Sequence, residues 1–330
     1  MAHGAGGKAS RRLLEGLFAP LLFGDFSGPL SDAARVGLKG NQLAITADSF
    51  VVNPLSFPGG SIGQLAINGT VNDLAVSGAQ PEAIVVTFVL EAGLRTEVLE
   101  AEVCSMASAA QLAGVRVVGG DTKVVEHGKA DGMYVTTAGI GSPMRGVYVD
   151  AGSVRPGDKV LLSGPIGDHG ITILLARGEL DLEADLKSDT RSVFPLVDAM
   201  AREAAPGIRW MRDPTRGGVA TSLNELARDC GMGIRLAEDL IPVRDSVRGA
   251  CELLGLDPLH IANEGQFLAV VSPDYAMAAW NALQQTPGGE ESQIIGEVHE
   301  QPADSVLITT PYGGSRIIDM LVGDPLPRIC

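Results

Sequence analysis

Apolar positions in the first half of the chain follow two spacings, and these predict alternating strands and helices. The β-branched run 83–90 predicts a buried strand, and the runs 115–118 and 133–139 predict two more. Apolar residues of 97–113 recur mostly at helical spacing, and Gly114 is a favourable residue just past a helix end. Further elements are expected as short strands at 43–45 and 50–52 and as a helix at 62–76.

Turn-forming residues at 142–158 separate this half from a second set of elements. In that set we expect strands at 159–162, 266–271 and 293–298. We also expect one helix that begins at Asp213-Pro214-Thr215 and a second helix at 273–283. The sequence therefore predicts an α/β protein of the α+β type with mixed sheets. Its expected parts are residues 1–150, residues 151–322 and a flexible C-terminal tail, 323–330.

Composition narrows the class of protein. Hydrophobic residues make up 45% of the 330 residues, and the formal charge of −15 argues against nucleic acid or an anionic membrane as partner. No run of 18 apolar residues predicts a membrane span. The arginine pair at 11–12 is followed by an apolar stretch at 13–23, which is expected to form an amphipathic helix rather than part of an export signal. The cysteines form no CxxC pair, so Cys104, Cys230 and Cys251 are expected in the core, in a reducing, cytoplasmic compartment.

The fourth cysteine, Cys330, is the last residue. Chain ends are usually mobile, and Pro325 and Pro327 stiffen the approach, so we expect a tethered thiol that swings from solvent into a pocket. The alternative is a terminal cysteine without a function. A prenylation motif is excluded, because its cysteine stands four residues from the end.

Three acidic residues lie in separate segments where a ligand can bind. Asp48 sits between two short strands, and Asp121 directly follows a strand, where α/β sheets bind ligands. Asp73 lies beside a polar stripe on its helix, formed at every fourth position by Gln64, Asn68 and Asn72. Gathered in one pocket, the three acids would suit Mg²⁺ with substrate phosphates, and three unrelated loop or capping acids are an equally supported alternative.

Glycine-rich and strand-end loops supply the remaining candidates. Gly6-Gly7-Lys8 suits a mobile flap around phosphates, with a tail of no function as the alternative. Asp213-Pro214 suits a helix start, and the following Arg216-Gly217-Gly218 suggests an anion close to it. Glu264 precedes a strand and is either a general base or a solvated turn residue. His169 is expected to form hydrogen bonds rather than to act as a catalyst.

A set of short segments carries a family resemblance: 3–8 (HGAGGK), 46–49 (TADS), 58–60 (PGG), 72–78 (NDLAVSG), 120–125 (GDTKVV), 167–170 (GDHG), 212–218 (RDPTRGG), 263–265 (NEG) and 327–330 (PRIC). Together they resemble the ATP-dependent enzymes related to aminoimidazole ribonucleotide synthetase and selenophosphate synthase. Within that superfamily the chain is similar to the HypE family of carbamoyl dehydratases, which the terminal cysteine singles out. The resemblance covers nearly the whole chain.

The resemblance implies a homodimer whose N-terminal sheets join into a barrel, with ATP and Mg²⁺ near the interface. The expected metal ligands are Asp48, Asp73 and Asp121. The expected nucleotide contacts are Gly6, Gly7, Lys8, Asn72, Asp73, Asp121, Thr122, Arg216 and Gly217.

The resemblance also implies that the substrate is part of the protein. A carbamoyltransferase, HypF, would load a carbamoyl group on Cys330, and ATP-dependent loss of water would leave a thiocyanate. Glu264 would be the base and Lys123 would stabilise the reacting oxygen. The cyanide would pass to iron on the scaffold HypC–HypD for nickel–iron hydrogenase. A non-enzymatic carrier tail and a small-molecule kinase or synthase of the same superfamily stay open as alternatives.

Overall fold

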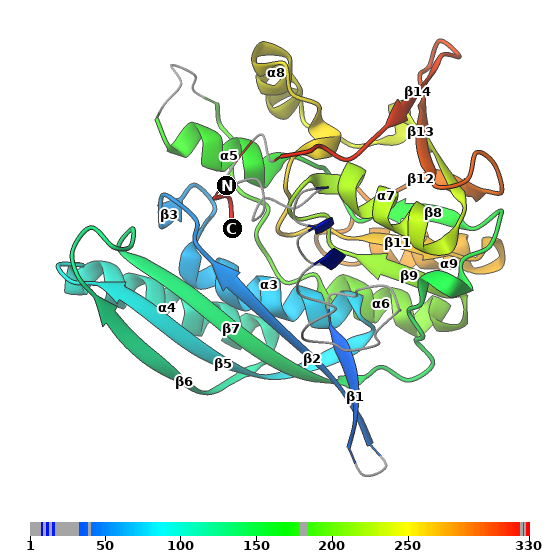
Figure 1. The fold of residues 1–330 in the computed structure, drawn as a ribbon. Coiled ribbons are helices and arrows are strands. Elements are labelled where there is room, and N and C mark those ends of the chain that lie inside the picture. The colour runs from blue at the N-terminus through cyan, green and yellow to red at the C-terminus, as the bar shows by residue number, and fades with distance from the viewer. Residues whose placement is uncertain are drawn as a thin grey trace.

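A computed structural model describes residues 8, 11–12, 15–16, 33–38, 41–178, 184–323, 326 and 328–330. In these ranges the chain forms two large β-sheets that lie side by side, each flanked by helices (Figure 1). The mixed α/β class predicted from the sequence is confirmed.

The first sheet contains, among the described residues, five strands in the order β1 (Ala34–Leu38), β2 (Asn41–Phe50), β7 (Met133–Pro143), β5 (Ala79–Glu91) and β6 (Arg116–Val125). Neighbouring strands are antiparallel except β5 and β6. Helices α3 (Ile62–Val76) and α4 (Thr96–Ala113) pack on one face, and a hairpin of β3 (Ser56–Phe57) and β4 (Gly60–Ser61) precedes α3. The bounds of α3 match the predicted helix 62–76, whereas β6 is longer than the predicted strand 115–118.

Helix α3 is buried on almost every side, because the residues outside its polar stripe are mostly apolar or small. Gln64 and Asp73 are its partly exposed residues. A side chain at Gly69 would collide with Phe50 of β2, so this glycine lets helix and sheet approach closely. The polar stripe predicted on this helix therefore faces other parts of the protein rather than bulk solvent.

The second sheet has, in the described part of the chain, the order β14 (Ser315–Ile318), β13 (Ser305–Thr309), β10 (Gly233–Ala237), β12 (Gln293–His299), β8 (Lys159–Leu162), β11 (Leu268–Val271) and β9 (Ile208–Arg212). Helix α7 (Gly218–Cys230) covers one face, while α6 (Phe194–Ala204) and α9 (Pro273–Gln284) cover the other. Each face buries a separate aliphatic core. Short 3-10 helices connect these elements at η3 (Ala151–Ser153), η4 (Ala205–Gly207), η5 (Glu238–Leu240) and η6 (Pro258–His260).

A third apolar core joins the two halves of the molecule. It combines residues of α3 and α4 with α5 (Asp168–Ala176) and α8 (Asp245–Leu254). Leu326 and Ile329 belong to it, and each is only 3% exposed. The described residues of the chain end therefore pack against both halves in this conformation, and the flexibility predicted for the tail 323–330 stays a prediction.

The structure bears on several further predictions, with different outcomes. The helix predicted from Asp213 begins at Gly218, because Gly217 takes a left-handed conformation with φ of 75°. Cys104 is exposed rather than in the core, whereas Cys251 is buried. The helix predicted at 13–23 lies largely outside the described residues. No helix among the described residues is long and apolar enough to cross a membrane.

Candidate active site

Glu264 lies in the loop between η6 and β11, and its side chain is buried. Asn263 fixes this loop. Its side chain accepts the N–H of Gly167 at 2.7 Å and donates to the carbonyls of Pro214 at 2.9 Å and Ile261 at 3.0 Å. Three loops that the sequence singled out therefore meet at one place.

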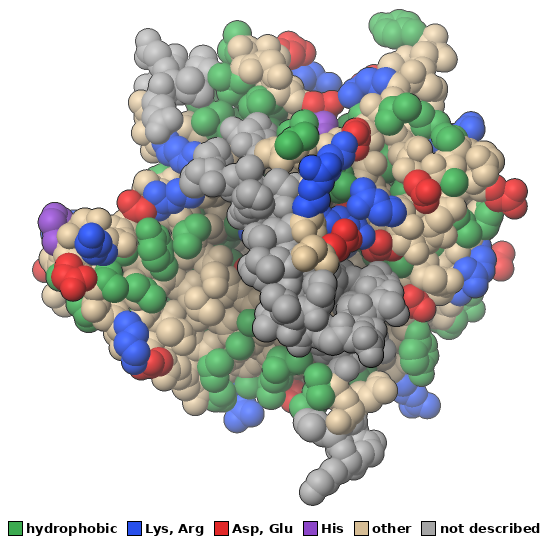
Figure 2. All heavy atoms as spheres, viewed as in Figure 1, with side chains coloured by type: hydrophobic (Ala, Val, Ile, Leu, Met, Phe, Trp, Pro, Cys, Tyr) green, Lys and Arg blue, Asp and Glu red, His purple; other side chains and the backbone are tan. Residues whose placement is uncertain are grey.

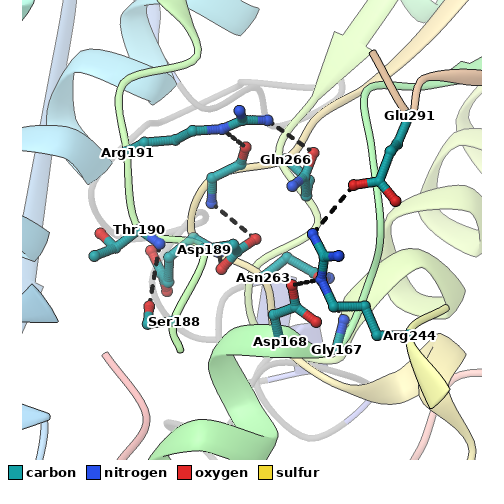
Figure 3. Close-up of polar contacts among 12 residues, drawn as sticks. Gly167, Asp168, Ser188, Asp189, Thr190, Arg191, Arg244, Asn263, Gln266 and Glu291 are labelled. Atoms are coloured by element: carbon teal, nitrogen blue, oxygen red, sulfur yellow. Dashed lines mark hydrogen bonds and ion pairs between the residues drawn. The ribbon is translucent and has the colours of Figure 1, made fainter. Parts of the chain in front are cut away.

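A segment that the sequence did not single out, residues 188–191, holds the backbone around Glu264 (Figure 3). Asp189 accepts the N–H groups of Glu264 at 3.0 Å and Gly265 at 3.2 Å. Arg191 donates to the carbonyls of Gly265 at 2.9 Å and Gly288 at 2.8 Å. Such order is hard to read from sequence, because every contact joins residues far apart in the chain.

Asn72 of α3 ties this segment to the first half of the molecule. Its side-chain amide donates to the carbonyls of Arg191 at 2.9 Å and Glu264 at 3.2 Å, and its oxygen accepts the N–H of Val193 at 2.8 Å. Both N–H groups of the amide are thus used inside the protein. A contact between Asn72 and nucleotide stays a prediction, and the contacts present place Glu264.

Acidic neighbours surround Glu264. Burial raises the pKa of Glu264 well above its ordinary value, and the charges of Asp213, Asp48 and Asp189 raise it further, while Arg216 opposes them. Its Oε1 atom is buried and has no hydrogen-bond partner within the described residues. A proton donor on a substrate could satisfy this oxygen, so the side chain is suited to proton transfer.

Asp48 and Asp73 lie on the side of the first sheet that faces α3. Thr46 of β2 donates to the Asp73 carboxylate at 2.7 Å. A side chain at Gly69 of α3 would stand 3.9 Å from the Asp48 Oδ2 atom. Asp48 also raises the pKa of Glu264, so it lies close to that residue. Asp48 and Asp73, two of the predicted metal ligands, are therefore on the same side of the sheet as Glu264.

Asp121 lies on the opposite face of the same sheet. Ser49, Thr136, Thr87 and Asp121 are successive register partners across β2, β7, β5 and β6, so their side chains share one face. Asp48 is next to Ser49 in its strand and therefore points to the other face. Within one chain, the structure does not bring Asp121 together with Asp48 and Asp73.

Lys123 and Thr122 share the exposed strand β6 with Asp121. The Lys123 ammonium donates to Asp121 at 2.5 Å, and this hydrogen bond is the main cause that lowers the pKa of Asp121. Lys123 lies on the same outer face as Asp121, because the two are two positions apart in a strand. Inside a single chain, Lys123 therefore does not lie beside Glu264, and its role at the carbamoyl oxygen stays a prediction.

The acids present fit Mg²⁺ only in part. No three acidic, histidine or cysteine side chains in the described part of the chain are arranged to hold a metal ion together. Asp48 and Asp73 do supply carboxylate oxygens, and Mg²⁺ is commonly bound by one or two carboxylates together with substrate phosphates. The donor set thus suits a metal that arrives with a nucleotide.

The C-terminal residues up to Cys330 are docked between the end of β2 and helix α5. The carbonyl of Cys330 accepts the N–H of Val51 at 2.9 Å, just after β2. The carbonyl of Ile329 lies 3.0 Å from the Nε2 atom of His169, and Arg177 donates to the carbonyl of Arg328 at 2.8 Å. The expectation that His169 forms hydrogen bonds is confirmed.

The remaining candidates are placed as follows. Gly6 and Gly7 lie outside the described residues. Lys8 pairs with Asp319 at 2.5 Å, so its contact with phosphates stays a prediction. Arg216 is exposed and close enough to affect Glu264, while Gly217 and Gly218 pack against the protein's own chain.

The sequence singled out Asp213 but gave it a different role from the one it has in the structure. Its position before Pro214 suggested a helix cap, but α7 begins five residues later. It is instead a buried acid whose charge is the largest electrostatic influence on Glu264.

Comparisons with known proteins agree along the whole chain. Residues 30–142 match the family model for the N-terminal domain of AIR synthase related proteins, and residues 155–309 match that for the C-terminal domain. The chain is 49% identical over 330 residues to the carbamoyl dehydratase HypE of Azotobacter vinelandii, covering 100% of this chain and 96% of the relative.

Solved structures give the same result. The HypE–HypF complex contains a chain that is 43% identical, with a TM-score of 0.88, covering 94% of this chain and 99% of the other. A structure of HypE in complex with ATP is 44% identical, with a TM-score of 0.84 and coverage of 99% and 98%. Identity at this level along the full length places the chain in the HypE family of carbamoyl dehydratases, within the AIR synthase related proteins.

Proposed function

We propose that the protein uses ATP to dehydrate a carbamoyl group carried on the sulfur of Cys330, leaving a thiocyanate. The observation that carries this proposal is a C-terminal cysteine docked between the two halves of the molecule in a chain related to carbamoyl dehydratases over its full length. The overall change is Cys–S–CO–NH₂ plus ATP to Cys–S–C≡N plus ADP, phosphate and one proton. The carbamoyl oxygen leaves as part of the phosphate.

The chemistry assigns roles to the residues of the site. Both N–H protons of the carbamoyl group must leave, and Glu264 is the buried carboxylate suited to accept one. The carbamoyl oxygen must attack the γ-phosphorus, and Lys123 would stabilise its charge. Mg²⁺ held by Asp48, Asp73 and Asp121 would neutralise the phosphates. Gly6, Gly7, Lys8, Thr122, Arg216 and Gly217 are proposed nucleotide contacts.

We also propose a homodimer that completes this site. The outer face of the first sheet exposes Val36, Ile45, Val85 and Ile140, an apolar surface unusual for a sheet that faces water. Strand β6 at its edge has no buried residue. Figure 2 shows hydrophobic side chains over this part of the surface. Two copies joined by these faces into a barrel would bring Asp121 and Lys123 of one copy to the site of the other.

The proposed partners follow from the reaction. A carbamoyltransferase must load Cys330, and the relative seen in the HypE–HypF complex supports HypF in this role. The scaffold HypC–HypD would receive the cyanide. A reducing compartment, the cytoplasm, would keep the thiol of Cys330 free.

The mass of the C-terminal peptide tests the proposal. After loading and addition of ATP, the wild-type peptide should lose the mass of one water. Cys330→Ala should fold and accept no carbamoyl group. Glu264→Gln should be loaded but convert ~10²–10⁴ times more slowly, because the amide cannot take the proton. A carbamoyl group recovered on the exposed Cys104, or normal conversion by Glu264→Gln, would contradict the assignment.

A further inference from the structure

The end of the chain is held through its backbone as well as through side chains, such as the Arg328 guanidinium that pairs with Asp131 and the buried Ile329. The carbonyls of Arg328, Ile329 and Cys330 contact, in turn, Arg177, His169 and Val51. None of these contacts uses the thiol of Cys330. The three contacts therefore do not require a free thiol, although the Cys330 side chain itself packs against the core that joins the two halves.

His169 has partners on both sides of its ring. It is fully buried, its Nε2 atom lies 3.0 Å from the Ile329 carbonyl, and its Nδ1 atom lies 2.8 Å from Ser188 Oγ. A carbonyl can only accept, so Nε2 carries the proton and donates it. Burial lowers the pKa of His169 to about 4, so the ring is neutral and Nδ1 accepts the hydroxyl proton of Ser188.

Ser188 begins the segment that holds Glu264. Its Oγ atom accepts the N–H of Thr190 at 3.1 Å (Figure 3). Its backbone N–H donates to the Pro58 carbonyl at 2.9 Å. The next residue, Asp189, holds the N–H groups of Glu264 and Gly265. A side chain at Gly59 would come within 3.0 Å of the Ser188 backbone, so the segment is tightly confined.

We propose that His169 is a positioning residue that docks the C-terminal residues and couples their docking to the placement of Glu264 through Ser188 and Asp189. The coupling rests on the proposed function, because it aligns the carrier end with the base that acts on it. Such coupling is reciprocal, so the tail should stabilise the Glu264 loop as much as the loop stabilises the docked tail.

Alkylation of Cys330 tests the docking half without ATP or a carbamoyl group. The exposed Cys104 serves as internal reference, and mass spectrometry reads both sites. Losing one hydrogen bond of ordinary strength should raise the alkylation rate of Cys330 in His169→Ala by roughly 2- to 10-fold. His169→Gln keeps a donor at the Nε2 position and should behave like the wild type. His299→Ala, on β12 of the second sheet, is the matched control and should change nothing.

Hydrogen exchange tests the coupling half. A chain that lacks residues 328–330 should exchange the amides of Glu264 and Gly265 roughly 2- to 10-fold faster, since their segment has lost its support. Ser188→Ala should also speed this exchange and, because the coupling is reciprocal, should raise the alkylation rate of Cys330 as well. If His169→Ala does not fold, His169→Asn replaces it, because Asn reaches toward Ser188 but not Ile329.

Each result decides a different point. An unchanged alkylation rate in His169→Ala, or in His169→Asn where it replaces the alanine variant, would overturn docking by His169. Unchanged exchange after truncation would overturn the coupling. Failure of the wild type to convert a carbamoyl group would overturn the proposed function while leaving both measurements valid.

Discussion

Glu264 illustrates how much a single buried carboxylate depends on residues distant in sequence. Desolvation is the largest cause that raises its pKa, and Asp213, Asp48 and Asp189 add to it. A raised pKa means that the folded protein keeps a proton on Glu264 at pH values where the unfolded chain has already lost it. The charged form of Glu264 is thus a source of instability in the absence of a ligand.

Glu264→Gln should therefore stabilise the ligand-free protein at pH 8. Stability of the wild type should fall as pH rises from the ordinary glutamate pKa to the raised value in the fold, because only the unfolded chain readily loses the proton. The gap in melting temperature should close as pH falls toward 4. Asp189, with a pKa raised to about 6, adds a similar slope below pH 6 that both proteins share. Melting curves across pH check this, and a variant less stable than wild type at pH 8 would contradict it.

At the residue scale, the sequence indicated Glu264 and Cys330 through their positions at a strand mouth and a chain end. It gave no sign of the acidic surroundings of Glu264. Asp213 and Asp48 approach it only after both halves of the chain have folded, and the cap pattern around Asp213 pointed to a different role.

At the scale of elements, the 188–191 segment shows how an irregular stretch becomes ordered. It has no helix or strand, and its order comes from hydrogen bonds with α3, α5 and the loop before β11. Periodic patterns predicted α3, β8 and α9 closely, because their order follows from local burial. A segment held by distant partners has no periodic pattern.

Gly265→Ala should break the contact between this segment and the Glu264 loop. A Cβ atom at Gly265 would stand 1.8 Å from the Asp189 carbonyl oxygen, so the backbone must shift at a cost of ~1–3 kcal/mol of stability. Conversion of the loaded tail should fall with it, because Asp189 can no longer hold the loop.

Gly249→Ala is the matched control for this change. Gly249 lies in α8, and a Cβ atom there meets nothing within 4 Å, so alanine should stabilise the helix by up to ~1 kcal/mol. Denaturant unfolding compares the two variants. Equal stability for both would show that the 188–191 segment yields easily and does not confine the loop.

At the scale of the whole molecule, the proposed dimer rests on the apolar outer face of the first sheet. Ile45→Asp places a negative charge in that face. In a symmetric interface both copies carry this charge, so two buried carboxylates would oppose association. The variant should be monomeric in sedimentation at concentrations where the wild type is dimeric. Ile317→Asp, at an exposed isoleucine of β14 in the other sheet, should leave the dimer intact. Equal behaviour of the two variants would reject the face.

Mixed dimers test whether a site takes Asp121 from the other copy. Glu264→Gln and Asp121→Asn should each be inactive as homodimers. When the two are unfolded together and refolded, a mixed dimer has one site with an intact Glu264 and an intact Asp121 from its partner. With random pairing, half of the dimers are mixed and each has one good site, so about a quarter of wild-type conversion should return. Mixing Asp121→Asn with a chain that carries both changes should restore nothing. If Asp121 served the site of its own chain, neither mixture would recover conversion, because every site would lack one of the two groups.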